Sequence, residues 1–461
     1  MKKFIILAFF SFLSYSLFSI VENDGIIDLE NLPNYEDQDI PLYIRKDNTP
    51  NNNMITNIGA TLGRVLFYDK NLSVDNTVAC ASCHNQQDAF ADKEIASEGV
   101  AGTTGRHSMR LINSRFSDEE NFFWDERASS LEEQTSQPIQ DHIEMGFSGS
   151  DGDPNLDSLI SKLEQLEYYQ TLFTEAYGNS TITESRIQNA LSQFVRSIIS
   201  FDSKYDDNRI LVANDNLNFP NYTQSENMGR MLFMIPPQFN QNGEHVSGGF
   251  GCAGCHTPPE FDIDPRSRNN GVIESFTEEP DFDVTRSPSL RDIFNNNGEL
   301  NSPLMHTGIS MDASLENYND VSSEINNPNL DNRLRPQGNP QKLNMTEDQK
   351  NDIISFLKTL SGNDVYTNPI WSDPFDLNGE LIVTRGTNSV NNDELFEIYP
   401  NPADTYINIT SESYLDQVII YNAMGKIFFK GKANGRVDIS KLNTGKYFIK
   451  TKIGTKSFVK Y

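Results

Sequence analysis

The cysteines of this chain fall into two short motifs. Residues 80–84 read C-A-S-C-H and residues 252–256 read C-A-G-C-H, and the 461 residues contain no other cysteine. C-x-x-C-H is the attachment signature of a c-type haem, in which both thiols bond the porphyrin and the histidine becomes an axial ligand of the iron. The sequence therefore predicts two covalently bound haem c groups. The candidate haem-binding residues are Cys80, Cys83, His84, Cys252, Cys255 and His256.

Two other uses of C-x-x-C pairs fit less well. A zinc ribbon places its pairs about 15–20 residues apart, whereas residues 80 and 252 are 172 positions apart. A thioredoxin-like redox pair would not explain two copies, nor a histidine after each. Haem attachment explains both features.

Further motifs lie between and after the haem signatures. Residues 122–128 read F-F-W-D-E-R-A, residues 131–134 read L-E-E-Q, and P-I and E-M follow at 138–139 and 144–145. A P-x-x-H-x-G element spans 303–308. In this order the motifs resemble those of the bacterial di-haem cytochrome c peroxidases and the related MauG family, which show F-W-D-G-R-A, L-x-x-Q, P-I or P-V, and E-M. The resemblance covers roughly residues 57–361, with Glu126 in place of the usual glycine.

The resemblance implies a fold and a set of roles. The fold is mainly α, with two cytochrome c-like haem domains in tandem. Glu144 would be the acid–base residue, Gln134 its neighbour in the pocket, and Trp124 the tryptophan between the haems. His84 would bind the iron of the peroxidatic haem, and His256 that of the electron-accepting haem.

Elementary chemistry is consistent with the role of Glu144. Splitting the O–O bond of a peroxide needs a proton on the distal oxygen, and a carboxylate in a dry pocket can supply it near neutral pH because burial raises its pKa. A solvated surface acid remains the alternative for Glu144. A core position is the alternative for Trp124, and it is compatible with the functional role.

Two positions depart from the peroxidases. The loop at 97–102, where they carry a distal histidine, has none, which implies a five-coordinate peroxidatic iron, as in MauG. His107 stands where the family has the asparagine that holds a calcium ion between the haems. Imidazole is a poor ligand for this hard cation, so we expect weak calcium binding through Asn301, Pro303 and water.

The second haem needs a ligand opposite His256. The resemblance assigns Tyr318, because Y-N precedes N-P-x-L-D here as in MauG-like members. Met311 in the same segment is the alternative ligand, and a core aromatic is the alternative role of Tyr318. Arg291 is a candidate partner of a haem propionate, with a surface ion pair as its alternative.

A weak internal repeat organises the body of the chain. G-R-x-L-F occurs at 63–67 and 229–233, each time before a haem signature. Capping boxes at Thr181-x-x-Glu184 and Thr346-x-x-Gln349 begin two apolar-faced helices. We predict one haem domain over 54–180, a second over 181–362, and a polar linker over 363–394.

The C-terminal residues 395–461 form a different unit. They contain 10 basic and 5 acidic residues, a net charge of +5, while the other 394 residues contain 27 and 60, a net charge of −33. Short β-branched and aromatic runs between Gly and Asn turns predict a small all-β sandwich. Y-P-N-P at 399–402 and L-N-T-G-K-Y at 442–447 resemble the sorting domain of type IX (Por) secretion. A small carbohydrate- or surface-binding β module is the alternative.

The N-terminus predicts export. Lys2 and Lys3 precede an apolar stretch interrupted by serines, which is typical of a signal peptide over 1–20; a membrane anchor is the alternative. An irregular segment would follow over 21–53, and no other stretch is long and apolar enough to span a bilayer. The net charge of −28 argues against a nucleic-acid partner.

Together these features predict a secreted di-haem peroxidase. It would reduce hydrogen peroxide with electrons from a basic cytochrome-like donor, attracted by the acidic body. It would pass through the type IX machinery to the cell surface or medium, with the periplasm as the alternative location. A MauG-like oxidase acting on a protein or small molecule, and a non-enzymatic electron conduit, are the alternative functions. The sequence carries no signal for an oligomeric state.

Overall fold

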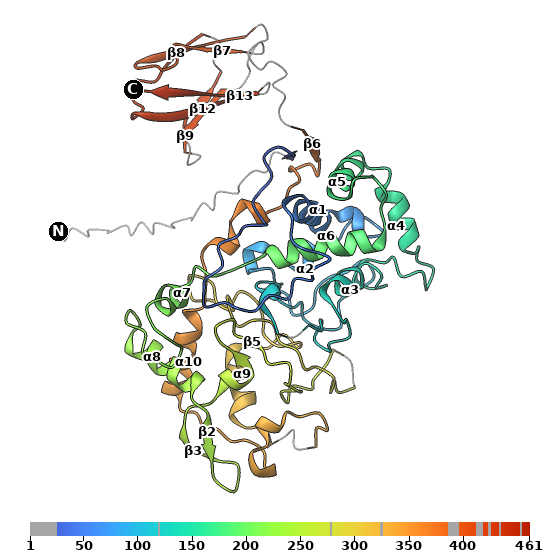
Figure 1. Cartoon of the computed structure of the whole chain (residues 1–461), viewed down its shortest axis with the longest axis vertical. Helices are drawn as coiled ribbons and strands as arrows, with labels where there is room; N and C mark the ends of the chain where they lie inside the picture. Colours follow the sequence, from blue (N-terminus) through green and yellow to red (C-terminus); the bar gives the residue numbers. More distant parts are fainter. Residues whose placement is uncertain are drawn as a thin grey trace, which may run out of the picture. The chain divides into compact units, whose positions relative to one another are not determined.

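A computed structural model describes residues 25–461 except 119, 277–278, 323–325, 386–395, 412–417, 423–425, 433–434 and 452–453. The chain divides into two compact units. The first extends to Val383 without Asp28–Asn31, and the second comprises Asp28–Asn31 and Thr384–Tyr461. Figure 1 shows helices and long loops in the first unit and strands in the second. The predicted signal peptide lies outside the described residues.

The first unit is mainly α-helical, as predicted. Short two-stranded pairs join β1 with β6, β2 with β3, and β4 with β5. No helix within the described ranges has the length and apolar character needed to cross a bilayer. The helices are α1 Asn57–Tyr68, α2 Cys80–Cys83, α3 Leu131–Ser136, α4 Leu156–Leu163, α5 Glu167–Tyr177, α6 Glu184–Ser197, α7 Lys204–Arg209, α8 Gln224–Met234, α9 Met311–Asn319 and α10 Glu347–Lys358. The strands are β1 Ile26–Asp28, β2 Pro237–Phe239, β3 His245–Gly248, β4 His256–Thr257, β5 Asp262–Ile263 and β6 Ile382–Thr384.

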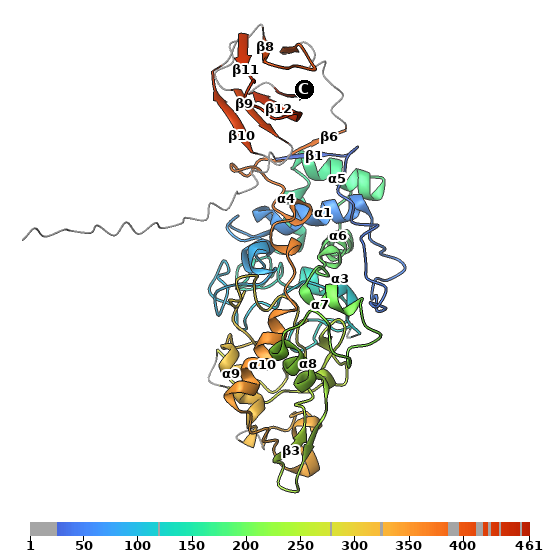
Figure 2. The same ribbon diagram turned by 90° about the vertical axis from the view of Figure 1, so that its left-hand side faces the viewer.

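Two helix pairs give the sequence repeat its structure. α1 packs on α6, and α8 packs on α10 (Figures 1 and 2). At each crossing, the phenylalanine that ends the G-R-x-L-F motif packs against a phenylalanine of the partner helix. Phe67 lies 5.1 Å from Phe194 between ring centroids, and Phe233 lies 5.3 Å from Phe356. The repeat is thus one helix–helix contact, used once before each haem signature.

The glycine of each motif allows this close approach. A Cβ at Gly63 would overlap the carbonyl oxygen of Ala190, and one at Gly229 would overlap that of Asp352. Backbone cannot give way as a flexible side chain can, so both helices need a residue without a Cβ at the crossing.

We therefore expect Gly63→Ala to destabilise the protein by about 1–3 kcal/mol, the usual cost of overpacking a tight contact. Gly105→Ala is the matched control, because a Cβ at Gly105 meets nothing within 4 Å. Denaturant unfolding of the haem-loaded proteins measures both effects. Equal stability of the two variants would contradict this account of the crossing.

The helix starts test the capping predictions. α10 begins with the predicted capping box. The Thr346 side chain accepts a hydrogen bond from the Gln349 backbone amide, and the Gln349 side chain accepts one from the Thr346 backbone amide. α6 differs, because Thr183 is its N-cap and accepts from the amide of Arg186. The box expected at Thr181 is therefore wrong, and the helix begins at Glu184.

The domain boundaries also differ from those expected. α6 was assigned to the second haem domain, but it packs against α1 in the first half. Residues 363–383, expected as linker, belong to the first unit. Within them Trp371 is buried and its indole Nε1 donates to Ser197 O over 3.0 Å. Polar composition suggested a linker, yet this segment packs against the helices. Of the remaining predicted linker, 384–385 belong to the second unit and 386–394 lie outside the described residues.

The second unit contains two antiparallel sheets. Their strand orders are β10-β9-β12-β13 and β11-β8-β7. Apolar residues of both sheets, such as Ile409, Ile420 and Ile449, form a common buried core. This is the predicted all-β unit. Its strands are β7 Glu397–Tyr399, β8 Tyr406–Thr410, β9 Val418–Asn422, β10 Ile427–Gly431, β11 Gly435–Asp438, β12 Gly445–Thr451 and β13 Gly454–Lys460.

Candidate haem sites

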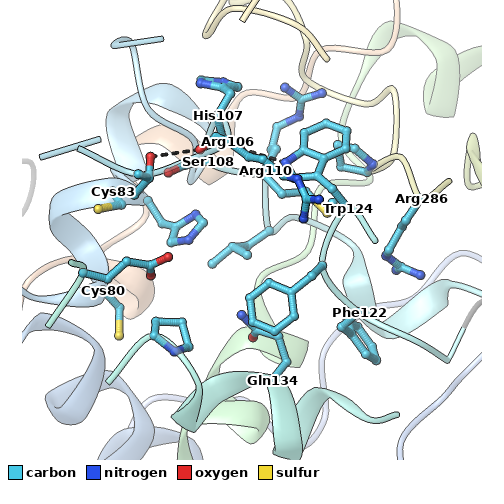
Figure 3. A pocket seen from close by; sticks show the side chains of 18 of the residues that line it. Cys80, Cys83, Arg106, His107, Ser108, Arg110, Phe122, Trp124, Gln134 and Arg286 are labelled. Atoms are coloured by element: carbon cyan, nitrogen blue, oxygen red, sulfur yellow. Dashed lines mark hydrogen bonds between the residues drawn. The ribbon is translucent and has the colours of Figure 1, made fainter. Parts of the chain in front are cut away.

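The first haem signature opens onto a large cavity in the first unit. Its volume is about 550 Å³, within the range of cofactor sites. Figure 3 shows its wall, with the two cysteines on one side and Trp124 and Gln134 across from them. The predicted site residues that line it are Cys80, Cys83, His84, Trp124, Gln134 and Glu144.

Local structure prepares His84 to bind a metal. Cys80–Cys83 form the single turn α2, and the His84 amide donates to Cys80 O over 3.0 Å. The ring Nδ1 lies 3.3 Å from the carbonyl oxygen of Phe90. Burial lowers the pKa of His84 to about 4, so its ring is neutral. A neutral ring that donates through Nδ1 leaves the Nε2 lone pair for iron, and this donor set fits a c-type haem.

The second signature opens onto a smaller cavity of about 110 Å³. Cys252 begins a short 3₁₀ turn, and His256 pairs with Ile263 between β4 and β5. Burial lowers the pKa of His256 to about 4, and its buried Nδ1 has no partner among the described residues. A neutral imidazole with an unsatisfied nitrogen beside two free thiols fits a second haem c.

The lining of the second cavity includes Tyr318 and the methionines Met109, Met305 and Met311. Tyr318 and Met311, the two ligands considered from the sequence, both line it. Met305 lines it as well and was missed. No sequence signal distinguished Met305, because it stands inside the P-x-x-H-x-G element and only the folded turn directs it to the cavity.

Trp124 lies in the wall that the two cavities share. It lines both, together with residues 107–110 and Pro288. Its Nε1 donates to His107 O over 2.8 Å, and its own carbonyl accepts from the amides of Thr285 and Arg286. Only 8% of its surface is exposed. Trp124 is therefore a core residue that also separates the two candidate haem sites.

Glu144 has the protonation behaviour expected of a buried acid. Burial, together with the charge of Asp141, raises its pKa to about 7 against the opposing charge of Arg127. Its amide donates to Asp141 Oδ1 over 3.0 Å, which holds the turn. Gln134 comes from the middle of α3, capped by Ser130. The structure brings both side chains to the cavity of His84.

Comparisons with known proteins identify both parts of the chain. Residues 58–212 match the family model of the di-haem cytochrome c peroxidases, and residues 397–461 match that of the secretion system C-terminal sorting domain. Residues 58–212 are therefore similar to a di-haem cytochrome c peroxidase domain.

Relatives extend the similarity beyond the matched segment. The methylamine utilization protein MauG of Methylophilus methylotrophus is 28% identical over 68% of this chain and 85% of its own length. The cytochrome c551 peroxidase of Nitrosomonas europaea is 27% identical over 66% and 80%. A solved MauG-like protein associated with microbial copper homeostasis is 26% identical, with a TM-score of 0.57 over 73% of this chain and 99% of its own. The family implies two c-type haems.

The match of residues 397–461 to a sorting domain indicates where the protein is delivered. A sorting domain of this kind indicates type IX secretion to the cell surface or the medium. The protein is therefore exported; the N-terminal signal peptide stays a prediction.

Glu126, which replaces a glycine of the family motif, has a backbone conformation typical of glycine. Glu126 occupies the glycine position of F-W-D-G-R-A and has a φ of +56°. That is the left-handed region, which glycine tolerates best. The turn after Trp124 thus keeps the backbone conformation suited to glycine although the residue differs.

Arg291 is not where the propionate prediction needs it. It is fully buried and pairs with both oxygens of Asp206 at 2.9 and 3.0 Å, and its side chain lines neither cavity, although its backbone oxygen accepts from Arg110 Nε over 3.1 Å. Neither a propionate contact nor a surface ion pair describes it; it is an internal charge pair. Arg110 lines both cavities instead. Burial lowers its pKa to about 10, because the cation loses its hydration. A buried cation of this kind favours contact with an anionic group.

The calcium prediction involves the backbone carbonyls of Asn301 and Pro303, and the nearby side chains make contacts of their own. The Asn301 side chain donates to Asp292 O over 2.7 Å and to the Tyr366 hydroxyl over 3.0 Å. The Nδ1 of His107 lies 3.0 Å from Glu94 O. Weak calcium binding at Asn301 and Pro303 stays a prediction.

Peroxide turnover should depend on pH through Glu144. Its carboxylate is the form that accepts a proton, and its pKa is about 7. We expect kcat/KM to fall about tenfold for each pH unit below that value. Asp141→Asn removes a charge that raises this pKa, so the acid limb should move to lower pH; Arg127→Gln should move it upward. Steady-state assays from pH 5 to 9, roughly two units on each side of this pKa, measure the acid limb of kcat/KM. If both variants moved the limb in the same direction, Glu144 would not be the titrating group.

Proposed function

We propose that the protein is a secreted di-haem c-type peroxidase that reduces hydrogen peroxide to water. Two cytochrome c-like haem domains in tandem would form its body. Electrons would enter at the haem of His256 and reach the haem of His84 past Trp124. The observation that carries the proposal is Glu144, an acid with a pKa of about 7 in the cavity of the first haem signature.

The haems, when bound, supply the redox chemistry, and the chain's own residues manage protons and position. The Glu144 carboxylate takes the proton of the incoming peroxide and returns it to the distal oxygen, which becomes water. The Gln134 amide lines the same cavity and can hold the peroxide by a hydrogen bond. Both groups lie in a largely buried site, where hydrogen bonds to a developing charge are strong.

The electron path has a physical basis in the shared wall. Trp124 is held at its indole nitrogen and at its carbonyl, so its ring has one orientation between the cavities. His306 lies beside it, with ring centroids 6.1 Å apart. Tyr318 is proposed as the second axial ligand of the haem at His256.

The donor would be a basic cytochrome-like protein. The body outside the C-terminal residues 395–461 has a net charge of −33. A surface of this sign accelerates the approach of a cationic partner and makes the association sensitive to salt.

A MauG-like oxidase is the second candidate function. The loop at 97–102 contains no histidine to occupy the peroxidatic iron, so this site would be open before reduction. Similarity to MauG supports the same reading. An electron conduit is disfavoured because it needs no acid–base group such as Glu144.

One experiment separates the three. Peroxide turnover with a reduced basic cytochrome is compared with oxidation of candidate substrates by the peroxide-treated enzyme. We expect rapid turnover of the cytochrome. Substrate oxidation without cytochrome turnover would favour the oxidase, and neither activity in a protein carrying two haems would favour the conduit.

A further inference from the structure

One asparagine contacts two donors that face the second cavity. The Asn270 amide nitrogen lies 3.3 Å from the sulfur of Met305 and 3.2 Å from the hydroxyl oxygen of Tyr318. The sum of these distances is the upper limit of the separation between sulfur and oxygen. Both side chains also line the cavity of His256. A thioether and a phenol, each able to bind haem iron, thus lie within reach of one another.

The orientation of the Asn270 amide is determined by its neighbours. Its side-chain oxygen accepts a hydrogen bond from the Val272 amide over 3.0 Å. Its backbone oxygen accepts one from the Asn317 side chain over 3.0 Å. With the oxygen engaged, the NH₂ group must face Met305 and Tyr318.

Met305 is held at the cavity by a tight turn. Leu304 and Ile309 exchange two backbone hydrogen bonds, of 2.8 and 2.7 Å, around it. Its φ is +61°, in the left-handed region that residues with a Cβ rarely adopt. Such strain persists only where surrounding structure imposes it, and it is concentrated at functional sites.

Tyr318 approaches from the helix that follows this turn. It lies in the last turn of α9, and its carbonyl accepts from the Gln341 side chain over 2.8 Å. The turn leads directly into α9 through its N-cap Ser310, so Met305 and Tyr318 lie at the two ends of one continuous segment, with Asn270 as a contact common to both side chains.

We propose that Tyr318 and Met305 are alternative axial ligands of the haem attached at Cys252 and Cys255, exchanged when the iron changes oxidation state, and that Asn270 is the positioning residue that keeps both in reach. The inference rests on the proposed function, in which this haem accepts electrons. The hard, anionic phenolate oxygen suits ferric iron, and the soft thioether suits ferrous iron and raises the potential.

The exchange consumes one electron and one proton. One electron from the cytochrome-like donor reduces ferric to ferrous iron. The iron–oxygen bond to Tyr318 breaks, and the phenolate takes up one proton from solvent. The iron–sulfur bond to Met305 forms. The potential of this haem therefore falls as pH rises, with one proton taken up per electron.

The test uses the full-length, haem-loaded protein and records spectra at controlled potentials. We expect the ferric wild type to lack the long-wavelength absorption band of methionine–iron ligation. Tyr318→Phe should acquire it, with a higher potential that no longer depends on pH. Adding Met305→Leu should remove the band. Adding Met311→Leu instead is the matched control, because Met311 lines the same cavity, and the band should remain.

Asn270→Leu extends the test to the positioning role. Without the amide, the hydrogen bond to the Tyr318 oxygen is lost, and the ferric protein should show part of the methionine band. An unchanged ferric spectrum and potential in Asn270→Leu would overturn the role of Asn270. A high-spin Tyr318→Phe without the band, or a band removed by Met311→Leu, would overturn the ligand exchange.

Two measurements distinguish failure of this inference from failure of the proposed function. Haem content and peroxide turnover are recorded on each wild-type preparation. Two haems with rapid turnover but no methionine band in Tyr318→Phe reject the exchange alone. A wild type without two haems or without turnover rejects the proposed function.

Discussion

Glu144→Gln should retain both haems and lose most peroxide turnover, by about 10²–10⁴-fold, the usual value of a general acid–base group. Glutamine keeps the size of the side chain and its capacity for hydrogen bonds, but it cannot take up and return a proton. Turnover of hydrogen peroxide with a reduced cytochrome measures the loss, and the absorption spectrum verifies the haems.

Glu164→Gln is the control for this substitution. Glu164 is an exposed acid at the end of α4, so removing its charge should leave turnover unchanged. The acid limb of the pH profile should also disappear in Glu144→Gln and remain in Glu164→Gln. Turnover of Glu144→Gln within about twofold of wild type would rule out the acid–base assignment, since even a weak acid–base contribution exceeds this.

Deletion of residues 395–461 should leave a folded, haem-loaded enzyme that accumulates at a different location. The deleted strands have their own buried core, and both candidate haem sites lie within the other unit. The matched family is a sorting domain, so its loss should abolish delivery to the cell surface or medium. Cell fractionation with haem staining measures the distribution.

The truncated protein provides its own control. Its haem content, unfolding midpoint and peroxide turnover should equal those of the full chain, because no lining residue of either cavity is removed. Loss of haem or of cooperative unfolding would show that the tail is part of the catalytic body. Unchanged secretion would show that another signal directs export.

Short motifs determined the chemistry of this protein from sequence alone. Haem attachment is a covalent reaction of residues within five positions, so its prediction at 80–84 and 252–256 does not depend on where they lie in the fold. The peroxidase motifs likewise named Trp124, Gln134 and Glu144, which the structure brings to one cavity. The strand pattern of the tail was also readable, because alternation and turn residues are local properties.

Contacts between distant segments were decided only by the tertiary structure. α6 packs on α1 rather than on the half of the chain that follows it. The Trp371 indole donates to the carbonyl of Ser197, the last residue of α6, more than 170 positions earlier. Arg291 was expected at a haem but pairs with Asp206, while Arg110 lines the cavities. Composition and spacing report which groups can pair, whereas the choice of partner depends on which side chains the folded backbone brings within hydrogen-bonding distance.

The same reason explains Met305 and Asn270. Each is an ordinary residue in the sequence, and 35 positions separate them. A strained turn carries one and a loop carries the other, and they meet only when the haem-binding half is folded. Local sequence determines what a residue can bind, and long-range packing determines what lies close enough to be bound.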